Sequence, residues 1–356
     1  MIETRSSDKP QRIRVMLVED SPIELHLLRN MFATADDMEL VGIAKNGLEA
    51  LRLLPQLRPD VVCTDYHMPV MDGLEFITLA MQQHPCPILV LSCSVQPDQK
   101  NNIFRLLSAG ALDVMAKPIG HGGHLGPAST APLLGKIRAI VNAPVEARKH
   151  LHTLAQRQGK HSPHGSARPA RSELVAIGSS TGGPQALQQI LSQLPQNFQA
   201  PVVCVQHISE GFLPGMIDWL QSSCQLKIQI AQAGDSPQRS EVYFAPDGHH
   251  LMLDVHRRFR LEACKATSLH CPGIDPLMES VAMHYGPAGM GVVLSGMGRD
   301  GAVGLTAMHE AGATTVAQDE HSCVIFGMPA AAISMGAARH VLPTDEIARL
   351  MLRQVT

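Results

Sequence analysis

This sequence has few aromatic residues and a small net charge. Only 3% of the 356 residues are aromatic, and the formal net charge is -3. A charge this close to zero gives no global basic field, so we expect no binding to nucleic acid or to an anionic membrane. No apolar run approaches the roughly 18 residues of a membrane span, and residues 1–14 lack the apolar core of a secretory signal. We therefore expect a cytoplasmic protein without direct insertion into a membrane.

The eight cysteines contain no Cys-x-x-Cys pair, so a zinc site is not expected. Several cysteines stand inside apolar runs, where buried free thiols are common, and a reducing compartment fits that placement. Aliphatic residues are plentiful instead. Hydrophobic residues make up 45% of the chain, which is typical of soluble α/β domains, and 356 residues suit two of them.

Apolar runs typical of strands alternate with helical patterns over residues 1 to 140. The runs are Ile13–Val18, Leu40–Ala44, Val61–Thr64, Ile88–Ser92 and Asp113–Met115, and the helical patterns lie near 22–35, 46–54, 73–84, 98–109 and 133–141. This alternation predicts a parallel sheet covered by helices on both faces. Functional groups then gather at the carboxyl ends of the strands.

Polar and charged side chains stand at these predicted strand ends, namely Glu19, Asp20, Asp65, Ser92 and Lys117. Three carboxylates in one crevice stay ionised together when a divalent cation lies among them, and Mg²⁺ suits an all-oxygen site. One carboxylate can then accept a phosphoryl group, whose charge the metal and Lys117 neutralise. Acidic caps at strand ends are the structural alternative, but so many groups together favour the phosphoryl site.

The segment Asp65-Tyr-His-Met-Pro-Val-Met-Asp-Gly73 resembles the phosphoacceptor segment of receiver domains in two-component response regulators. The resemblance implies that Asp65 accepts phosphate from a histidine kinase. It also implies that Glu19 and Asp20 hold Mg²⁺ together with Asp65. The family often has Asp at both positions of the acidic pair, whereas this chain has Glu19 first.

Further expectations concern the neighbours of this segment. The resemblance implies that Ser92 and Lys117 sense the phosphoryl group, and that the Lys117–Pro118 bond is cis. Ser21 is predicted to be the N-cap of the helix after the first strand, with Glu24 completing a capping box.

A Gly- and His-rich stretch at 120–127 and a basic stretch with Pro, Ser and Gly at 141–172 follow. We interpret residues 141–172 as an exposed linker between domains. The alternative functional interpretation of these basic residues is nucleic-acid binding, but no aromatic residues are interleaved with them. The predicted division is residues 1–140, the linker 141–172, and a second domain over 173–356.

The second domain begins with Leu174-Val-Ala-Ile-Gly-Ser-Ser-Thr-Gly-Gly-Pro184, which predicts a strand, a tight turn and a helix. Gly178, Ser180 and Gly182 fit the G-x-S-x-G pattern of a nucleophile elbow, which raises the serine hydroxyl above the sheet edge. On the motif alone, a plain Gly/Ser loop or a phosphate cradle remains an alternative.

Two further strands of this domain end at residues that suit acyl transfer. The run 201–206 ends at His207, and the run 291–295 leads into the loop that contains Asp300. In a parallel sheet these ends share one edge with Ser180. His207 would then take the Ser180 proton, and Asp300 would orient the imidazolium. A structural histidine and an Asp-Gly turn are the alternatives for the two partners.

The backbone amides of Thr181 and Met297 are candidates for an oxyanion hole beside this serine. The chain order Ser, His, Asp differs from the Ser, acid, His order of α/β-hydrolases, so a standard lipase-type enzyme is not expected.

The blocks 176–183, 206–207 and 294–301 resemble the signatures of the chemotaxis protein-glutamate methylesterase (CheB) family, and 245–250 resembles a further block. The resemblance implies two doubly wound parallel-sheet α/β domains, a receiver and a larger methylesterase domain. The implied reactions are hydrolysis of glutamate methyl esters and deamidation of glutamines on methyl-accepting chemoreceptors, without a cofactor for the esterase step. It also implies that the unphosphorylated receiver inhibits the enzyme. A response regulator with a non-catalytic, partner-binding output and a general serine esterase remain the alternatives.

Overall fold

The structure is a computed structural model that describes residues 12–93, 100–118, 125–141, 171–265 and 267–355. The predicted linker and residues 120–124 of the Gly- and His-rich stretch lie almost wholly outside these ranges. The described residues divide into two compact units, 12–93 with 109–118 and 125–141, and 100–108 with 171–265 and 267–355. Each unit is an α/β structure, as the sequence predicts.

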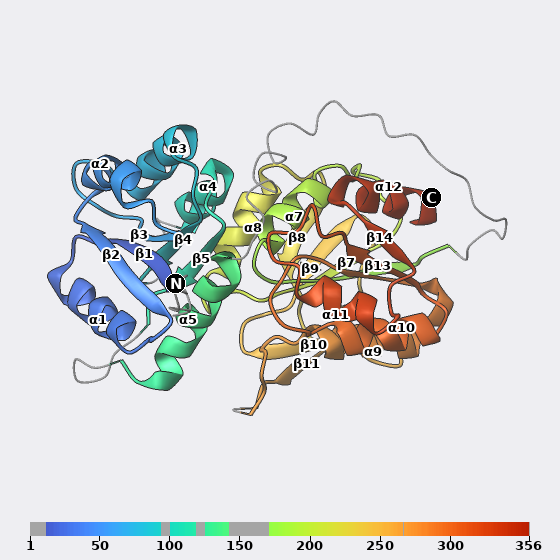
Figure 1. The fold of residues 1–356 in the computed structure, drawn as a ribbon. Helices are drawn as coiled ribbons and strands as arrows, with labels where there is room; N and C mark the ends of the chain where they lie inside the picture. Colours follow the sequence, from blue (N-terminus) through green and yellow to red (C-terminus); the bar gives the residue numbers. More distant parts are fainter. Residues whose placement is uncertain (1–11, 94–99, 119–124, 142–170, 266, 356) are drawn as a thin grey trace, which may run out of the picture. The chain divides into compact units, whose positions relative to one another are not determined.

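The first unit is built on a parallel sheet with the strand order β2-β1-β3-β4-β5. Its strands are β1 (Ile13–Val18), β2 (Met38–Ala44), β3 (Val61–Asp65), β4 (Ile88–Ser92) and β5 (Asp113–Ala116). Its helices are α1 (Pro22–Ala33), α2 (Gly47–Leu57), α3 (Gly73–Gln83) and α5 (Pro127–Val141). The helix α4 (Lys100–Ala109) lies between β4 and β5 in the chain but belongs, except for Ala109, to the second unit. Figure 1 shows α1 and α5 on one face of the sheet and α2 and α3 on the other.

The start of α1 differs from its prediction in one respect. The Ser21 hydroxyl is the N-cap and accepts a hydrogen bond from the Glu24 amide at 3.4 Å, as expected. The Glu24 carboxylate, however, pairs with Lys117, and the Ser21 amide donates to the Glu19 carboxylate at 3.1 Å instead. The capping box is therefore only half formed, because a buried cation is a stronger partner for Glu24 than a backbone amide.

The second unit is built on a seven-stranded sheet with the order β14-β13-β12-β6-β7-β9-β8, in which every pairing is parallel. Its strands are β6 (Leu174–Ser179), β7 (Val202–Gln206), β8 (Lys227–Ile230), β9 (Glu241–Phe244), β12 (Gly289–Val293), β13 (Thr314–Gln318) and β14 (His340–Leu342). The segments β10 (His249–Leu253) and β11 (Phe259–Ala263) form a separate antiparallel hairpin.

Helices cover both faces of this larger sheet. They are α7 (Gly183–Leu191), α8 (Leu213–Gln221), α9 (Ile274–Tyr285), α10 (Ala302–Glu310), α11 (Met328–Ser334) and α12 (Thr344–Val355). In Figure 1, α9, α10 and α11 lie on one face, whereas α7, α8 and α12 lie on the other. The strands β6, β7 and β12 are buried along their whole length because both faces are covered. The central strands are therefore rigid supports for the loops at their ends.

The cysteines match their prediction only in part. Five free thiols are buried, namely Cys63, Cys86, Cys204, Cys224 and Cys323, and Cys93 is exposed. Cys264 and Cys271 form a disulfide, which the sequence analysis did not anticipate. Their spacing matches no pairing motif, so only the return of the chain after β11 brings them together.

The expected cis bond at Lys117–Pro118 is also wrong, because the cis peptide within the described ranges is Cys271–Pro272. Without a contact that favours cis, the trans form of an X–Pro bond is lower in free energy by about 0.5–1 kcal/mol.

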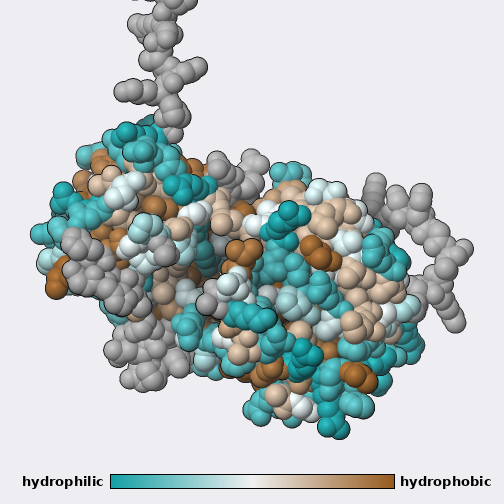
Figure 2. Space-filling view, turned by 90° about the horizontal axis from the view of Figure 1, so that it is seen from below, coloured by the Kyte–Doolittle hydropathy of each residue, from teal (hydrophilic) through white to brown (hydrophobic). Residues whose placement is uncertain are grey.

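The molecular surface is mixed in character. On the face shown in Figure 2, hydrophobic side chains occur in small groups among hydrophilic ones. Across the described ranges, we find no helix with the length and hydropathy needed to cross a membrane.

Candidate functional sites

The three strands at the centre of the larger sheet carry the predicted acyl-transfer residues at one edge. In the sheet order, β12 and β7 flank β6 directly, with Val293 beside Gly178 and Ser179 beside Gln206. Ser180 follows β6, His207 follows β7, and Asp300 lies in the loop between β12 and α10. The predicted common edge is therefore present in the structure.

A tight turn after β6 holds Ser180. Its amide donates to the Ser295 carbonyl at 3.0 Å, which ties the turn to the loop after β12. Gly182 has a φ of 77°, a conformation that favours glycine, and a side chain at Gly296 would place its Cβ 2.7 Å from the Ser180 Cβ. The serine thus lies where two loops approach too closely for larger residues.

Gln206 connects the serine turn to the histidine turn. The Ser179 hydroxyl donates to its side-chain oxygen at 2.6 Å. Its side-chain nitrogen donates to the carbonyls of Ser180 and His207, each at 2.9 Å. No sequence motif predicts this role for Gln206; its place directly before His207 at a strand end is the available signal.

Ser295 fixes the other side of the serine turn. Its hydroxyl donates to the Thr181 carbonyl at 2.8 Å and accepts from the amides of Val324 and Ile325 at 3.1 and 3.0 Å. Sequence reasoning missed this residue as well, because a buried serine after a strand has no motif of its own.

His207 and Asp300 are in direct contact. His207 Nε2 lies 2.9 Å from Asp300 Oδ2, and the two side chains are 13% and 7% exposed. Asp300 also accepts hydrogen bonds from the amides of Ile274, Asp275 and Gly301 at 2.9–3.0 Å. Two of these amides open α9, where the helix dipole favours an anion.

These contacts determine the charge of Asp300 and the tautomer of His207. Burial alone would raise the pKa of Asp300, but the hydrogen bonds from His207 and from the Ile274 and Asp275 amides together hold it well below its ordinary value. An ionised Asp300 requires a donor at His207 Nε2. The lone pair of neutral His207 is then on Nδ1, which is free to accept a proton.

Ser180 and the proposed oxyanion donors make fewer hydrogen bonds within the site than His207 and Asp300 do. In the described part of the chain, the Ser180 hydroxyl makes no hydrogen bond to His207, and the amides of Thr181 and Met297 donate to no protein acceptor. Such catalytic hydrogen bonds often form only when substrate binds. Two unpaired amides near a half-buried serine are what an oxyanion hole requires.

His270 is a residue of this edge that sequence reasoning missed. Its ring stacks on His207 with a centroid distance of 4.5 Å and an interplanar angle of 5°. It lies in the loop that the Cys264–Cys271 disulfide closes. Partial burial, followed by the nearby His207, lowers the pKa of His270. With 18 histidines in the chain, no sequence pattern distinguishes this one.

Asp275 is a second carboxyl group beside Asp300. Its side chain accepts a hydrogen bond from the Gly304 amide at 2.7 Å. Burial, with a further contribution from the charge of Asp300, raises the pKa of Asp275 from 3.8 to about 6. The folded protein therefore binds this proton more tightly than the unfolded chain.

This shift gives a prediction for stability against pH. Between the unfolded pKa of 3.8 and the folded pKa of about 6, the stability contribution of Asp275 is lost as the pH rises. Asp275→Asn keeps the acceptor for Gly304 but carries no charge. We expect it to raise the midpoint of thermal unfolding at pH 7.5 more than at pH 4.5. Asp218→Asn, at an exposed site, is the control, and an equal change at both pH values would contradict the prediction.

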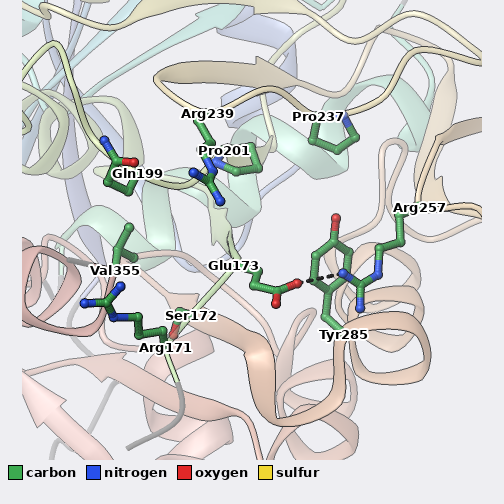
Figure 3. Close-up of a pocket in the computed structure, with 10 residues that line it drawn as sticks. All are labelled: Arg171, Ser172, Glu173, Gln199, Pro201, Pro237, Arg239, Arg257, Tyr285 and Val355. Atoms are coloured by element: carbon green, nitrogen blue, oxygen red, sulfur yellow. Dashed lines mark hydrogen bonds and ion pairs between the residues drawn. The ribbon is translucent and has the colours of Figure 1, made fainter.

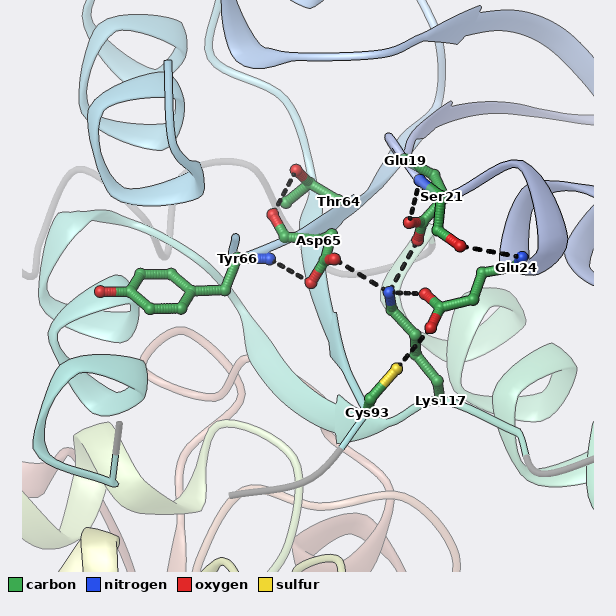
Figure 4. A network of polar contacts seen from close by, with 8 residues as sticks. All are labelled: Glu19, Ser21, Glu24, Thr64, Asp65, Tyr66, Cys93 and Lys117. Carbon is green, nitrogen blue, oxygen red and sulfur yellow. Dashed lines mark hydrogen bonds and ion pairs between the residues drawn. The ribbon is translucent and has the colours of Figure 1, made fainter. Parts of the chain in front are cut away.

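The first unit has its own polar cluster at the carboxyl ends of its strands, shown in Figure 4. The Lys117 ammonium lies 2.8 Å from a Glu19 oxygen and 2.9 Å from Asp65 Oδ2, and it also pairs with Glu24. Burial would lower the pKa of Lys117, but its bonds to Glu19 and Glu24 and the charge of Asp65 raise it overall. The lysine is therefore a firmly charged partner of Asp65.

The acidic members of this cluster differ from the predicted set. Oxygen atoms of Glu19, Glu24 and Asp65 lie within 4.8 Å of one another, whereas Asp20 is exposed and outside the group. Burial raises the pKa of Glu19 to about 7, with a smaller contribution from Asp65. Carboxylate oxygens crowded in this way fit a hard divalent cation such as Mg²⁺, which would relieve their repulsion.

Ser92 is buried at the end of β4, and its carbonyl accepts the Lys117 amide hydrogen bond at 2.8 Å. Among the residues that the structure describes, no hydrogen bond joins its hydroxyl to Asp65. Its predicted role in sensing a phosphoryl group remains a prediction.

A cavity of about 440 Å³ lies in the second unit, away from the acyl-transfer residues. Figure 3 shows that Ser172, Glu173 and Pro201, which precede β6 and β7, line it. It is therefore at the amino-terminal edge of the sheet. Ser180, His207 and Asp300 lie at the opposite edge and do not line the cavity, so it does not extend the serine site. Within it, Arg257 pairs with Glu173 at 2.7 Å.

Comparison with known proteins agrees with this two-part organisation. Residues 175–351 match CheB methylesterase, and residues 15–123 match the response regulator receiver domain. Protein-glutamate methylesterase/protein-glutamine glutaminase 3 of Hahella chejuensis is 39% identical over 344 residues, which cover 95% of this chain and 97% of that protein. The corresponding protein 2 of Anaeromyxobacter dehalogenans is 40% identical over 354 residues, 98% of each chain. Protein 1 of Syntrophus aciditrophicus is 36% identical over 352 residues, 96% of this chain and 98% of that protein. With relatives this similar over nearly its whole length, the chain belongs to the CheB methylesterase family, with a receiver domain preceding the methylesterase domain.

Proposed function

We propose that this chain hydrolyses glutamate γ-methyl esters and deamidates glutamines on methyl-accepting chemoreceptors, with Ser180 as the nucleophile. The observation that carries the proposal is the buried contact between His207 Nε2 and Asp300, which leaves His207 Nδ1 free at the sheet edge that holds Ser180. The names of the relatives, protein-glutamate methylesterase and protein-glutamine glutaminase, support the two reactions. Because chemoreceptors carry these groups on their cytoplasmic helices, we expect the protein to act in the cytoplasm.

The residues divide the acyl transfer between them. The Ser180 oxygen attacks the side-chain carbonyl while His207 Nδ1 takes the hydroxyl proton, and Asp300 stabilises the resulting imidazolium. The amides of Thr181 and Met297 stabilise the developing oxyanion. His207 then returns the proton to the departing methoxy oxygen or amide nitrogen, so that methanol or ammonia leaves, and water hydrolyses the acyl-enzyme by the same steps. We expect this reaction to need no cofactor.

The receiver domain provides the control. In the proposal, Asp65 accepts a phosphoryl group from a histidine kinase. The predicted Mg²⁺ ligands are Glu19, Asp20 and Asp65. Glu24 provides a further carboxylate close to Glu19 and Asp65. The metal supplies positive charge that neutralises the transferred phosphoryl oxygens. Lys117 already contacts Asp65, so it would pair with the new phosphoryl group, and Ser92 would hydrogen-bond to it. The phosphorylated receiver relieves its inhibition of the esterase.

Methanol release from methylated receptor membranes tests the proposal. We expect release by the full chain, and faster release when a small-molecule phosphodonor and Mg²⁺ are added. No release under any condition, while Asp65 is still phosphorylated, would contradict the esterase assignment and favour a partner-binding output. Strong turnover of small esters without any receptor would instead favour a general serine esterase.

Asp65→Asn separates control from chemistry. The variant cannot form the acyl phosphate, so we expect the phosphodonor to give no increase in methanol release while the basal rate persists. Asp36→Asn, which changes an exposed aspartate of the same domain, should respond to the phosphodonor like the wild type. Stimulation that persists in Asp65→Asn would show that control does not act through this residue.

A further inference from the structure

His270 has no task in the acyl-transfer steps, yet its ring lies directly on the catalytic histidine. The two rings are 5° from parallel with their centroids 4.5 Å apart. Unlike His207, His270 is exposed to solvent. The edge of the sheet therefore presents a second imidazole at a position that substrate and dissolved ions can reach.

Together with Asp300, the two histidines form a potential ligand set. One nitrogen from His207, one from His270 and one carboxylate oxygen of Asp300 all lie within 4.8 Å of one another. Two imidazoles and one carboxylate are a common protein ligand set for Zn²⁺, with metal–ligand distances of about 2.0–2.2 Å. Mg²⁺, by contrast, prefers oxygen ligands alone, so the set discriminates between the two ions.

Two of the three ligands are already fixed in place. The Asp300 carboxylate is oriented by the amides of Ile274, Asp275 and Gly301. The backbone of His207 is held by Gln206, whose side chain donates to its carbonyl at 2.9 Å. Contacts of this kind behind the ligands orient them and raise metal affinity.

The third ligand is on an anchored loop but can still turn. The disulfide between Cys264 and Cys271 closes the loop, and the Gly273 amide donates to His250 Nδ1 at 3.0 Å. Ligand atoms of a tetrahedral Zn²⁺ lie roughly 3.3 Å apart, so the stacked His270 ring has to tilt toward His207. Its exposed position permits this rotation.

We propose that His207, His270 and Asp300 form a Zn²⁺-binding site whose occupation inhibits the esterase. The metal would take the lone pair of His207 Nε2, and the proton from that nitrogen would move to Nδ1, so that the ring stays neutral. The lone pair that accepts the Ser180 proton is then lost, and Asp300 binds the metal instead of stabilising an imidazolium. The inhibition rests on the proposed function, whereas the binding itself does not.

The binding test uses the full chain without thiol reductants and with Mg²⁺ in large excess, which occupies the receiver cluster. Wild type, His270→Ala and His256→Ala are titrated with Zn²⁺ by calorimetry and with Co²⁺ by visible absorption, where four-coordinate Co²⁺ is strongly coloured. His256 is exposed and serves as the matched histidine control. We expect His270→Ala to lose one bound metal, or to bind it at least tenfold more weakly, with His256→Ala unchanged.

Methanol release provides the second readout. Each variant is compared with its own metal-free rate, and we expect half-inhibition of His270→Ala to require at least tenfold more Zn²⁺ than that of wild type. Equal binding and equal inhibition in the wild type and His270→Ala would overturn the site. Metal bound through His270 in a protein that releases no methanol would support the site but reject the esterase assignment, so the two failures are distinguishable.

Discussion

Ser180→Ala is expected to reduce methanol release by about 10⁴-fold or more, with phosphorylation of Asp65 unchanged. Loss of a serine nucleophile removes the covalent route, and only binding and the oxyanion donors remain to assist direct attack by water. Phosphorylation of Asp65 reports that the receiver of the variant is folded. Methanol release by the variants, with and without the phosphodonor, is the measurement.

Ser179→Ala is the matched control for this prediction. The Ser179 hydroxyl is fully buried and donates to Gln206, so it cannot reach a substrate. Its removal deletes one hydrogen bond behind the turn, which contributes about 1 kcal/mol of net free energy. Even if that whole amount were added to the activation free energy, the rate of methanol release would fall by less than tenfold. A larger loss from Ser179→Ala than from Ser180→Ala would show that the nucleophile has been assigned to the wrong serine.

Asp300→Asn is expected to lower the rate of methanol release by about 10³–10⁴-fold, with little change in receptor binding. The amide group of asparagine has to face either the Ile274 amide and His207, or the amides of Asp275 and Gly301. In the first orientation it donates to His207 Nε2, so the ring proton moves to Nδ1 and the base is lost. In the second orientation two buried backbone amides lose their acceptor, which costs about 1–3 kcal/mol each in stability.

Asp275→Asn tests whether this effect belongs to Asp300 specifically. The two carboxyl groups are neighbours, but only Asp300 contacts His207. We expect Asp275→Asn to stay within a few-fold of the wild-type rate. Similar losses from both variants would mean that the general negative charge of this region, rather than the orientation of His207, supports the reaction.

The sequence allowed the architecture to be predicted because both sheets are parallel and buried. Such strands appear as short apolar runs, and the residue after each run marks the functional edge. Ser180, His207 and Asp300 were found in this way, and so were Asp65 and Lys117. The predicted roles of these residues, and of Thr181, Met297 and Ser92, await the experiments above.

The remaining features depend on side-chain directions that a linear pattern does not contain. Glu24 was assigned to a helix cap, but its longer side chain extends to Lys117, whereas Asp20 faces solvent. His270 reaches His207 only because the chain returns over the sheet edge after β11. The Cys264–Cys271 disulfide depends on the same path of the chain after β11, and no motif of cysteine spacing predicts it.

The central position of β6 also has a consequence for the protein while it is being synthesised. β7 can pair with one side of β6 soon after both strands leave the ribosome, but the other side stays open until residues 289–293 have been made. An unpaired, fully apolar strand edge is prone to pair with other chains. Until β12 pairs with β6, Ser180 lacks the loop that contains Asp300, and the open edge of β6 can pair with other chains. The pairing of β12 with β6 therefore completes the site and protects the chain from aggregation in the same step of folding.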